Sequence, residues 1–251
     1  MTGRLLLVPN TLDLGAEQGP LDDVLPRGVL RMAAGLRWWV AEDARSARLF
    51  LKRVDAVCPL VQPLQAMEIK ELPRPRKGSR EAVPAAAWHE LLRPALQGHD
   101  IGLISDAGLP AVADPGAALV LAAHAADVPV VALPGPSSLL LAVAASGLNG
   151  QSFAFVGYLP QDASQRHARL VELEAASRRS GQTQIAIETP YRNATLLAAL
   201  TQSLSPATRL AVSCGLTLPG GWSRSDSVAG WRSKPQAMPD RWPAVFSFLA
   251  S

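Results

Sequence analysis

The chain has 251 residues, of which 48% are hydrophobic and 18% charged, and its formal net charge is +3. This composition argues against a disordered chain and is typical of a folded protein with a large core. The two cysteines, Cys58 and Cys214, are too few and too far apart for a disulfide framework or a zinc site. The histidines show no metal spacing either, so we expect no metal.

Neither a signal-peptide pattern nor an apolar run of membrane-spanning length interrupts the sequence, so we expect a cytoplasmic protein without a membrane segment. In the first half, apolar runs alternate with segments of helical spacing. The strands are predicted at residues 4–8, 38–41, 67–69, 101–105 and 128–133, and the helices at 21–36, 44–53, 88–96, 117–126 and 139–145. Asp114, which precedes Pro115, is expected to cap the helix that follows it.

The pattern of predicted strands and helices changes in the second half of the chain. Strands are predicted within 152–160 and at 184–187, 209–214 and 244–249, and helices at 163–179, 193–204 and 227–233. A glycine-bounded break near residues 147–151 predicts two domains, 1–148 and 149–251. Three late tryptophans lie close to arginines, a combination that suits either base stacking or core contacts. The sequence therefore predicts an α/β protein whose first half contains right-handed βαβ units.

Polar turns follow the predicted strands of the first half. The segment "SDAGLPAVADPG" follows the strand at 101–105, and "PGPSS" follows the strand at 128–133. Open α/β sheets bind ligands at the carboxyl ends of their strands, and glycine lets the backbone approach a ligand closely. The sequence has no GxGxxG, GxxxxGK[ST] or GxSxG motif. These residues by themselves predict a small-molecule α/β enzyme and no particular reaction.

A basic segment, "KELPRPRKGSREAVP", separates the third predicted strand from the next helix. It contributes four cationic side chains that we assign to substrate binding: Arg74, Arg76, Lys77 and Arg80. One interpretation is a basic lid over an anionic substrate. The other is a solvated surface loop without a ligand.

Several ordered motifs resemble one known family. "LISDAGLPAVADPG" is similar to its "SDAGTPxxxDPG" motif, "VVALPGPSSLLLAVAASGL" to "PLPGPxAxxxALxxSGL", and "SFAFVGYLP" to "FxFxGFLP". "AEDARSARLFLKR" and "IAIETPYRN" add two further blocks in the same order. On these motifs the chain resembles a divergent, short member of the RsmI-type branch (ribosomal RNA small-subunit methyltransferase I) of the tetrapyrrole methylase superfamily. The resemblance covers almost the whole chain.

The resemblance implies two α/β domains with a cofactor cleft between them, a homodimer, and S-adenosyl-L-methionine as the cofactor. It also implies that the chain methylates the 2'-hydroxyl of a nucleotide in small-subunit ribosomal RNA. Carried over by position, the cofactor-binding residues are Pro9, Leu14, Ser105, Asp106, Ala107, Gly108, Asp114, Pro134, Gly135, Pro136, Ser137, Glu188, Thr189 and Arg192.

A ribose hydroxyl needs a proton acceptor, and the sequence offers four candidates without choosing among them: Asp106, Glu42, Asp43 and Glu188. Glu42 and Asp43 have an equally good structural interpretation as helix caps. Departures from the family pattern, such as Leu109 in place of threonine, are more numerous in the substrate segments than in the cofactor segments. Two alternatives therefore stay open: a methyltransferase acting on a tetrapyrrole or another small molecule, and a cofactor-binding protein whose catalytic function has decayed.

Overall fold

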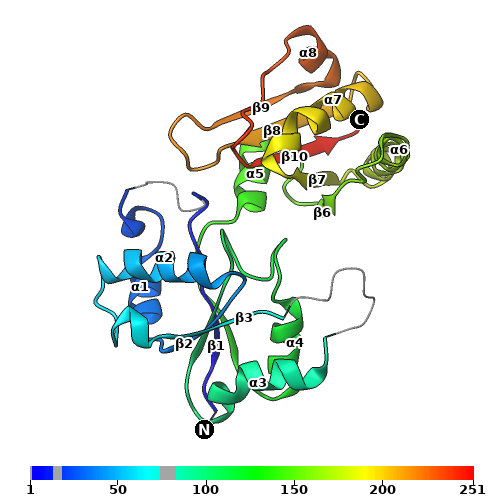
Figure 1. The fold of residues 1–251 in the computed structure, drawn as a ribbon. Coiled ribbons are helices and arrows are strands. Elements are labelled where there is room, and N and C mark those ends of the chain that lie inside the picture. The colour runs from blue at the N-terminus through cyan, green and yellow to red at the C-terminus, as the bar shows by residue number, and fades with distance from the viewer. Residues whose placement is uncertain (1, 14–18, 74–82) are drawn as a thin grey trace. The chain divides into compact units, whose positions relative to one another are not determined.

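The computed structural model describes residues 2–13, 19–73 and 83–251, and it divides into two compact units, Met1–Ser137 and Ser138–Ser251 (Figure 1). Each unit is built around its own five-stranded sheet, which confirms the predicted α/β class with two sheets. Leu14 and the four basic residues assigned to substrate binding lie outside the described residues. Within the described ranges, no helix is both long enough and apolar enough to span a membrane.

The first unit contains a wholly parallel sheet with the strand order β3-β2-β4-β1-β5. Its strands are β1 (Leu5–Leu7), β2 (Trp38–Ala41), β3 (Glu68–Glu71), β4 (Ile101–Ile104) and β5 (Val130–Ala132). Its helices are α1 (Arg27–Ala34), α2 (Ala44–Asp55), α3 (Ala85–Leu96) and α4 (Ala117–Ala125), with 3-10 turns η1 (Leu21–Asp23) and η2 (Leu64–Ala66). One core lies beneath α1 and α2, and a second beneath α3 and α4. All five strands therefore end at the same edge of the sheet.

The structure differs from two expectations about how helices begin in this unit, one within residues 21–36 and one at Asp114. The segment predicted as one helix over 21–36 is the turn η1 followed by α1, which begins directly after Pro26 because proline suits the start of a helix and not its interior. Asp114 does not cap α4. The helix begins at Ala117, and its N-cap position is taken by Gly116, whose φ of 131° only glycine adopts readily.

The second unit contains a mixed sheet with the order β6-β7-β10-β8-β9. Its strands are β6 (Phe153–Tyr158), β7 (Thr183–Glu188), β8 (Arg209–Cys214), β9 (Trp222–Ser227) and β10 (Ala244–Leu249). Its helices are α5 (Ser138–Ser146), α6 (Ala163–Ser180), α7 (Asn193–Ser203) and α8 (Val228–Ser233), with the 3-10 turn η3 (Pro190–Arg192). Side chains of α6, α7 and α8 pack on one face of this sheet, and α5 packs on the other.

The break between the compact units falls at Ser137 and Ser138, about one helix ahead of the glycine-rich stretch where the sequence predicted a domain boundary. The reason is the packing of α5. Leu139, Ala142 and Val143 are buried against Ile185 and Val245 of the second sheet. A helix that follows a first-unit strand in sequence thus completes the core of the second unit, and no compositional change marks that transition.

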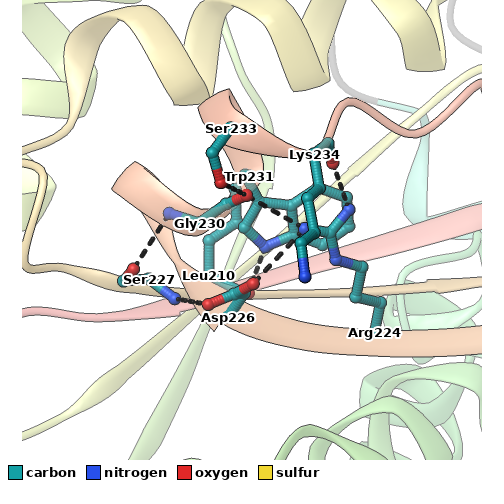
Figure 2. A network of polar contacts seen from close by, with 8 residues as sticks. All are labelled: Leu210, Arg224, Asp226, Ser227, Gly230, Trp231, Ser233 and Lys234. Carbon is teal, nitrogen blue, oxygen red and sulfur yellow. Dashed lines mark hydrogen bonds and ion pairs between the residues drawn. The ribbon is translucent and has the colours of Figure 1, made fainter.

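Strand β9 was not predicted, because its sequence "WSRSDS" has too few apolar residues to show a strand period. A polar network holds it to α8 (Figure 2). The Arg224 guanidinium lies 4.1 Å from the ring centre of Trp231 and donates to the carbonyl oxygens of Gly230 and Lys234. The indole N–H of Trp231 donates to the Leu210 carbonyl at 2.8 Å. Trp231 is fully buried, so here the core interpretation of the late tryptophans is correct.

Candidate functional site

The loops that follow β1 and β4 are joined by one residue, Asn10. Its main-chain N–H donates to the Gly108 carbonyl at 2.8 Å, and the Gly108 N–H donates back to the Asn10 carbonyl at 3.2 Å. The Asn10 side-chain amide donates to the carbonyls of Ser105 and Asp106, at 3.2 and 3.0 Å, while its Oδ1 accepts from the N–H of Thr11. Gly108 has a φ of +67°, which explains why glycine is required opposite Asn10.

A third loop, which follows β5, packs against the first. A Cβ added at Gly135 would lie 2.2 Å from the Cβ of Pro9, a distance that no side chain tolerates. The flanking residues Pro134 and Pro136 restrict the backbone of this turn, and Ser137 is buried at its end. The predicted first-unit residues that the structure describes are therefore brought together at the carboxyl edge of the parallel sheet, where α/β sheets bind ligands.

The segment between β4 and α4 adopts a strained backbone. Ala111 and Ala113 have φ values of 66° and 65°, and Gly116 has a φ of 131°. An alanine in the left-handed region costs about 1 kcal/mol or more, and such strain is concentrated at ligand sites and switch regions. The surrounding structure therefore holds this loop in a backbone conformation that its own alanine residues disfavour.

Three carboxylates gather around the same loop. Glu42 accepts a hydrogen bond from the main-chain N–H of Asp106, with a nitrogen–oxygen distance of 3.4 Å. Burial, followed by the negative charges of Glu42 and Asp106, raises the pKa of Asp114 to about 7. Asp43 plays a different part, because its Oδ1 caps α2 by accepting from the N–H of Ser46 at 2.8 Å. Its structural interpretation as a cap is therefore correct.

Two buried oxygens of this loop have no hydrogen-bond partner among the residues that the structure describes. They are Ser105 Oγ, on a side chain only 3% exposed, and Asp106 Oδ1. A buried oxygen without a partner costs about 1–3 kcal/mol, so each such oxygen calls for an explanation. A polar ligand that hydrogen-bonds to both would supply one. The carboxylates do not form a metal site, since no group of three or more metal-ligating side chains occurs in the described ranges.

A pocket of about 270 Å³ adjoins these loops and is lined by Asn10, Asp13, Ser46, Leu49, Phe50, Arg53 and Asp106. Arg53 and Asp13 form an ion pair of 3.0 Å in its wall, and the Thr11 hydroxyl donates to Asp13 at 2.7 Å. The ion pair ties α2 to the first loop. The sequence prediction missed Arg53. It assigned the loop bounded by Pro9 and Leu14 but did not single out Asn10 or Asp13 within it, although a polar residue directly after a buried strand was a signal that could have indicated Asn10.

The predicted residues of the second unit lie together within that unit. Glu188 ends β7, and its carboxylate accepts from the main-chain N–H of Thr189 at 2.9 Å and pairs with Arg192 at 3.2 Å. These three residues line a pocket of about 480 Å³ together with Tyr158, Leu159, Pro160, Gln161 and Tyr191. Because Glu188 is buried and paired, it serves the local structure of this pocket.

The fold and the site together define a class of α/β protein. In its first unit, polar loops meet at the carboxyl edge of a parallel sheet. One of these loops has a strained backbone and, among the described residues, two buried oxygens without a hydrogen-bond partner. A sequence profile of the Tetrapyrrole (Corrin/Porphyrin) Methylases matches residues 30–221. The chain belongs to this family. The match runs from α1 to the end of the loop after β8, so it includes strands of both sheets and the loops after β2, β4 and β5 but not β1, β9 or β10.

Curated relatives include the ribosomal RNA small subunit methyltransferases I of Streptococcus pyogenes serotype M6 and Mesorhizobium japonicum. The first is 33% identical over 191 residues, which are 76% of this chain and 57% of the relative. The second is 43% identical over 124 residues, 49% of this chain and 41% of the relative. The chain thus spans little more than half the length of the first relative.

Solved structures show the same fold at low sequence identity. Uroporphyrin-III C-methyl transferase from Thermus thermophilus, solved in complex with S-adenyl homocysteine, has a TM-score of 0.53 at 20% identity, covering 98% of this chain and 97% of that one. The methyltransferase CobJ has a TM-score of 0.57 at 18% identity, covering 98% and 94%. At such identities the comparison supports the two-domain α/β fold alone.

Replacing Asn10 tests whether it joins the loops. Asn10→Ala removes two side-chain donors and leaves the Thr11 N–H without its acceptor, so we expect the free energy of unfolding to fall by about 2–3 kcal/mol. Urea denaturation measures this, with Gln97→Ala, a truncation of an exposed amide, as the control. An Asn10→Ala midpoint equal to that of the control would show that the amide does not hold the loops.

The pKa of Asp114 predicts a pH dependence of stability. Between about pH 4 and pH 7 the folded state keeps a proton that the unfolded state has lost, so stability falls as the pH rises through this window. Asp114→Asn has no carboxyl to ionise. The melting temperature of the variant minus that of the wild type should therefore be a few degrees higher at about pH 8 than at about pH 5.

Asp240→Asn, at an exposed carboxyl of the second unit, is the control. If the difference in melting temperature between Asp114→Asn and the wild type is the same at both pH values, the raised pKa of Asp114 is refuted.

Proposed function

We propose that the chain is an S-adenosyl-L-methionine-dependent methyltransferase that acts on small-subunit ribosomal RNA, at a ribose 2'-hydroxyl. The observation that supports this most directly is the pair of buried oxygens without partners, Ser105 Oγ and Asp106 Oδ1, in a strained loop of a chain from this family. The curated relatives that the chain matches are ribosomal RNA methyltransferases. The proposed cytoplasmic location and homodimer are predictions from the sequence.

The loop residues fit the chemistry of this cofactor. The carboxylate of Asp106 suits a cationic amino or sulfonium group, since hydrogen bonds and contacts to an ionised carboxylate are stronger than neutral ones. The Ser105 hydroxyl adds a donor that is already desolvated. The turn at Pro134, Gly135 and Pro136 brings main-chain groups close to the first loop, as a flat polar ligand requires. We also assign Glu188, Thr189 and Arg192 to cofactor binding on the strength of the resemblance.

The cofactor supplies an activated methyl group, and the protein positions the hydroxyl that attacks it. Correct orientation alone can contribute roughly 7–11 kcal/mol of barrier reduction. The hydroxyl proton needs an acceptor whose pKa lies near the working pH. Asp114, with its pKa raised to about 7, meets this condition and joins Asp106 and Glu42 as a candidate. Asp43 is the weakest of the original four, because its carboxylate already caps α2.

Cofactor binding is tested at Gly135. Gly135→Ala places a methyl group against Pro9 and should displace the first loop, so we expect the affinity for S-adenosylhomocysteine to fall at least tenfold. Isothermal calorimetry of the full chain measures this. Gly28→Ala is the matched control, because a Cβ at Gly28 meets nothing within 4 Å. A wild-type chain that does not bind S-adenosylhomocysteine would overturn the proposal itself.

The substrate is tested by transfer of a labelled methyl group to small ribosomal subunits purified from a strain that lacks this gene. We expect label in ribosomal RNA, and mass spectrometry of nucleosides should place it on a ribose. Label on a base would correct the position. Label on a tetrapyrrole added in parallel, with none on RNA, would favour the small-molecule alternative. Tight cofactor binding without transfer to either substrate would identify a protein whose catalytic function has decayed.

A further inference from the structure

Three aromatic side chains share one face of the edge strand β6. Phe153 pairs with Thr183 in the ladder, and Phe155 pairs with Ile185. A bulge between Phe155 and Gly157 then shifts the register, so that Tyr158 pairs with Ile187. Without this bulge, Tyr158 would point to the opposite face, because side chains alternate along a strand. The bulge therefore aligns Phe153, Phe155 and Tyr158, which we call the aromatic stripe.

The aromatic stripe lies beside a part of the sheet that α5 covers, and its three side chains are exposed. Ile185 is completely buried beneath α5, whereas its ladder partner Phe155 is 38% exposed. Phe153 is 39% exposed and Tyr158 is 60% exposed. Among the described residues, β6 pairs with β7 alone, so the stripe follows an open sheet edge. Proteins usually protect such edges, so a row of exposed aromatic rings on one indicates a partner.

The stripe is continuous with the pocket of the second unit, since Tyr158 belongs to both. That pocket adds Tyr191, which is 73% exposed, beside the ion pair of Glu188 and Arg192. The unit as a whole is basic: residues 138–251 contain ten Lys and Arg against six Asp and Glu. Aromatic rings on a sheet face of a basic unit form the combination that binds single-stranded nucleic acid by base stacking.

We propose that the aromatic stripe is a stacking platform for unpaired nucleotides of the RNA substrate. This inference rests on the proposed function and deepens it, because it assigns RNA contacts to described residues of the second unit. Phe153 and Phe155 are two positions apart on a strand, about 6.6 Å, so each ring accommodates one base of an extended RNA strand. A second copy of the chain is the competing occupant, and the test below separates it from RNA by the oligomeric state of the variants.

The test compares stacking with general apolar contact. Phe155→Leu and Tyr158→Leu keep an apolar side chain but remove the ring, whereas Phe155→Tyr keeps the ring. Fluorescence anisotropy with a labelled single-stranded RNA of about ten nucleotides measures binding to the full chain. Each leucine variant should bind at least about fivefold more weakly, and Phe155→Tyr should bind as the wild type does. The salt dependence should be unchanged in all of them, because no charge is removed.

Two controls make the outcomes distinct. Val171→Ala, at an exposed residue of α6, should leave RNA affinity unchanged. S-adenosylhomocysteine affinity, measured by calorimetry, should be the same in Phe155→Leu and the wild type, because Phe155 lies outside the pocket that contains Glu188, Thr189 and Arg192. A wild-type chain that does not bind S-adenosylhomocysteine would refute only the proposed function. Leucine variants that retain full RNA affinity would overturn the stacking platform. So would sedimentation data in which Phe155→Glu converts a dimer to a monomer, because the stripe would then be an interface between copies.

Discussion

The first unit depends on a pair of main-chain hydrogen bonds between Asn10 and Gly108 that lies beyond the end of the sheet. Strands β1 and β4 already pair in the sheet, and the bridge continues this contact into the loops. The side chain of Asn10 then fixes the carbonyls of Ser105 and Asp106. These bonds hold the turn through its main chain, and Ser105 Oγ and Asp106 Oδ1 have no hydrogen-bond partner among the described residues. A loop held by its backbone can present its side chains to a ligand.

The electrostatics of the unit follow from this arrangement. Fixing Asp106 near Glu42 places two negative charges beside Asp114, which is itself half-buried. Asp13, in the first loop, forms an ion pair with Arg53. Carboxylates held close together disfavour ionisation, which is one cause of the raised pKa of Asp114. A cluster of negative charge suits a positively charged group, such as the sulfonium or amine of the proposed cofactor.

The sequence predicted the sheet elements well because they depend on apolar runs, and it failed where geometry depends on contacts distant in sequence. Strands β1, β2, β4 and β10 are apolar and stand out at once, whereas β9 is held by Arg224 and Trp231 rather than by its own composition. The glycines of the 105–116 loop predicted a turn, but not that Gly116 replaces Asp114 at the start of α4. Motif resemblance found the loop residues that carry the pattern. It did not single out Asn10, which lies between the predicted Pro9 and Leu14, because the role of Asn10 depends on hydrogen bonds to residues distant in the sequence.

Backbone irregularity sets the direction of the important side chains in both units. In the first unit, positive φ values at Gly108, Ala111 and Ala113 turn the chain so that Asp106 and Asp114 belong to one cluster. In the second, one extra residue in β6 turns Tyr158 onto the face that carries Phe153 and Phe155. In a regular strand Tyr158 would lie on the opposite face from Phe153 and Phe155. Irregularities of this kind are costly to maintain, so their coincidence with unsatisfied or uncovered side chains argues that ligands, rather than the fold, account for them.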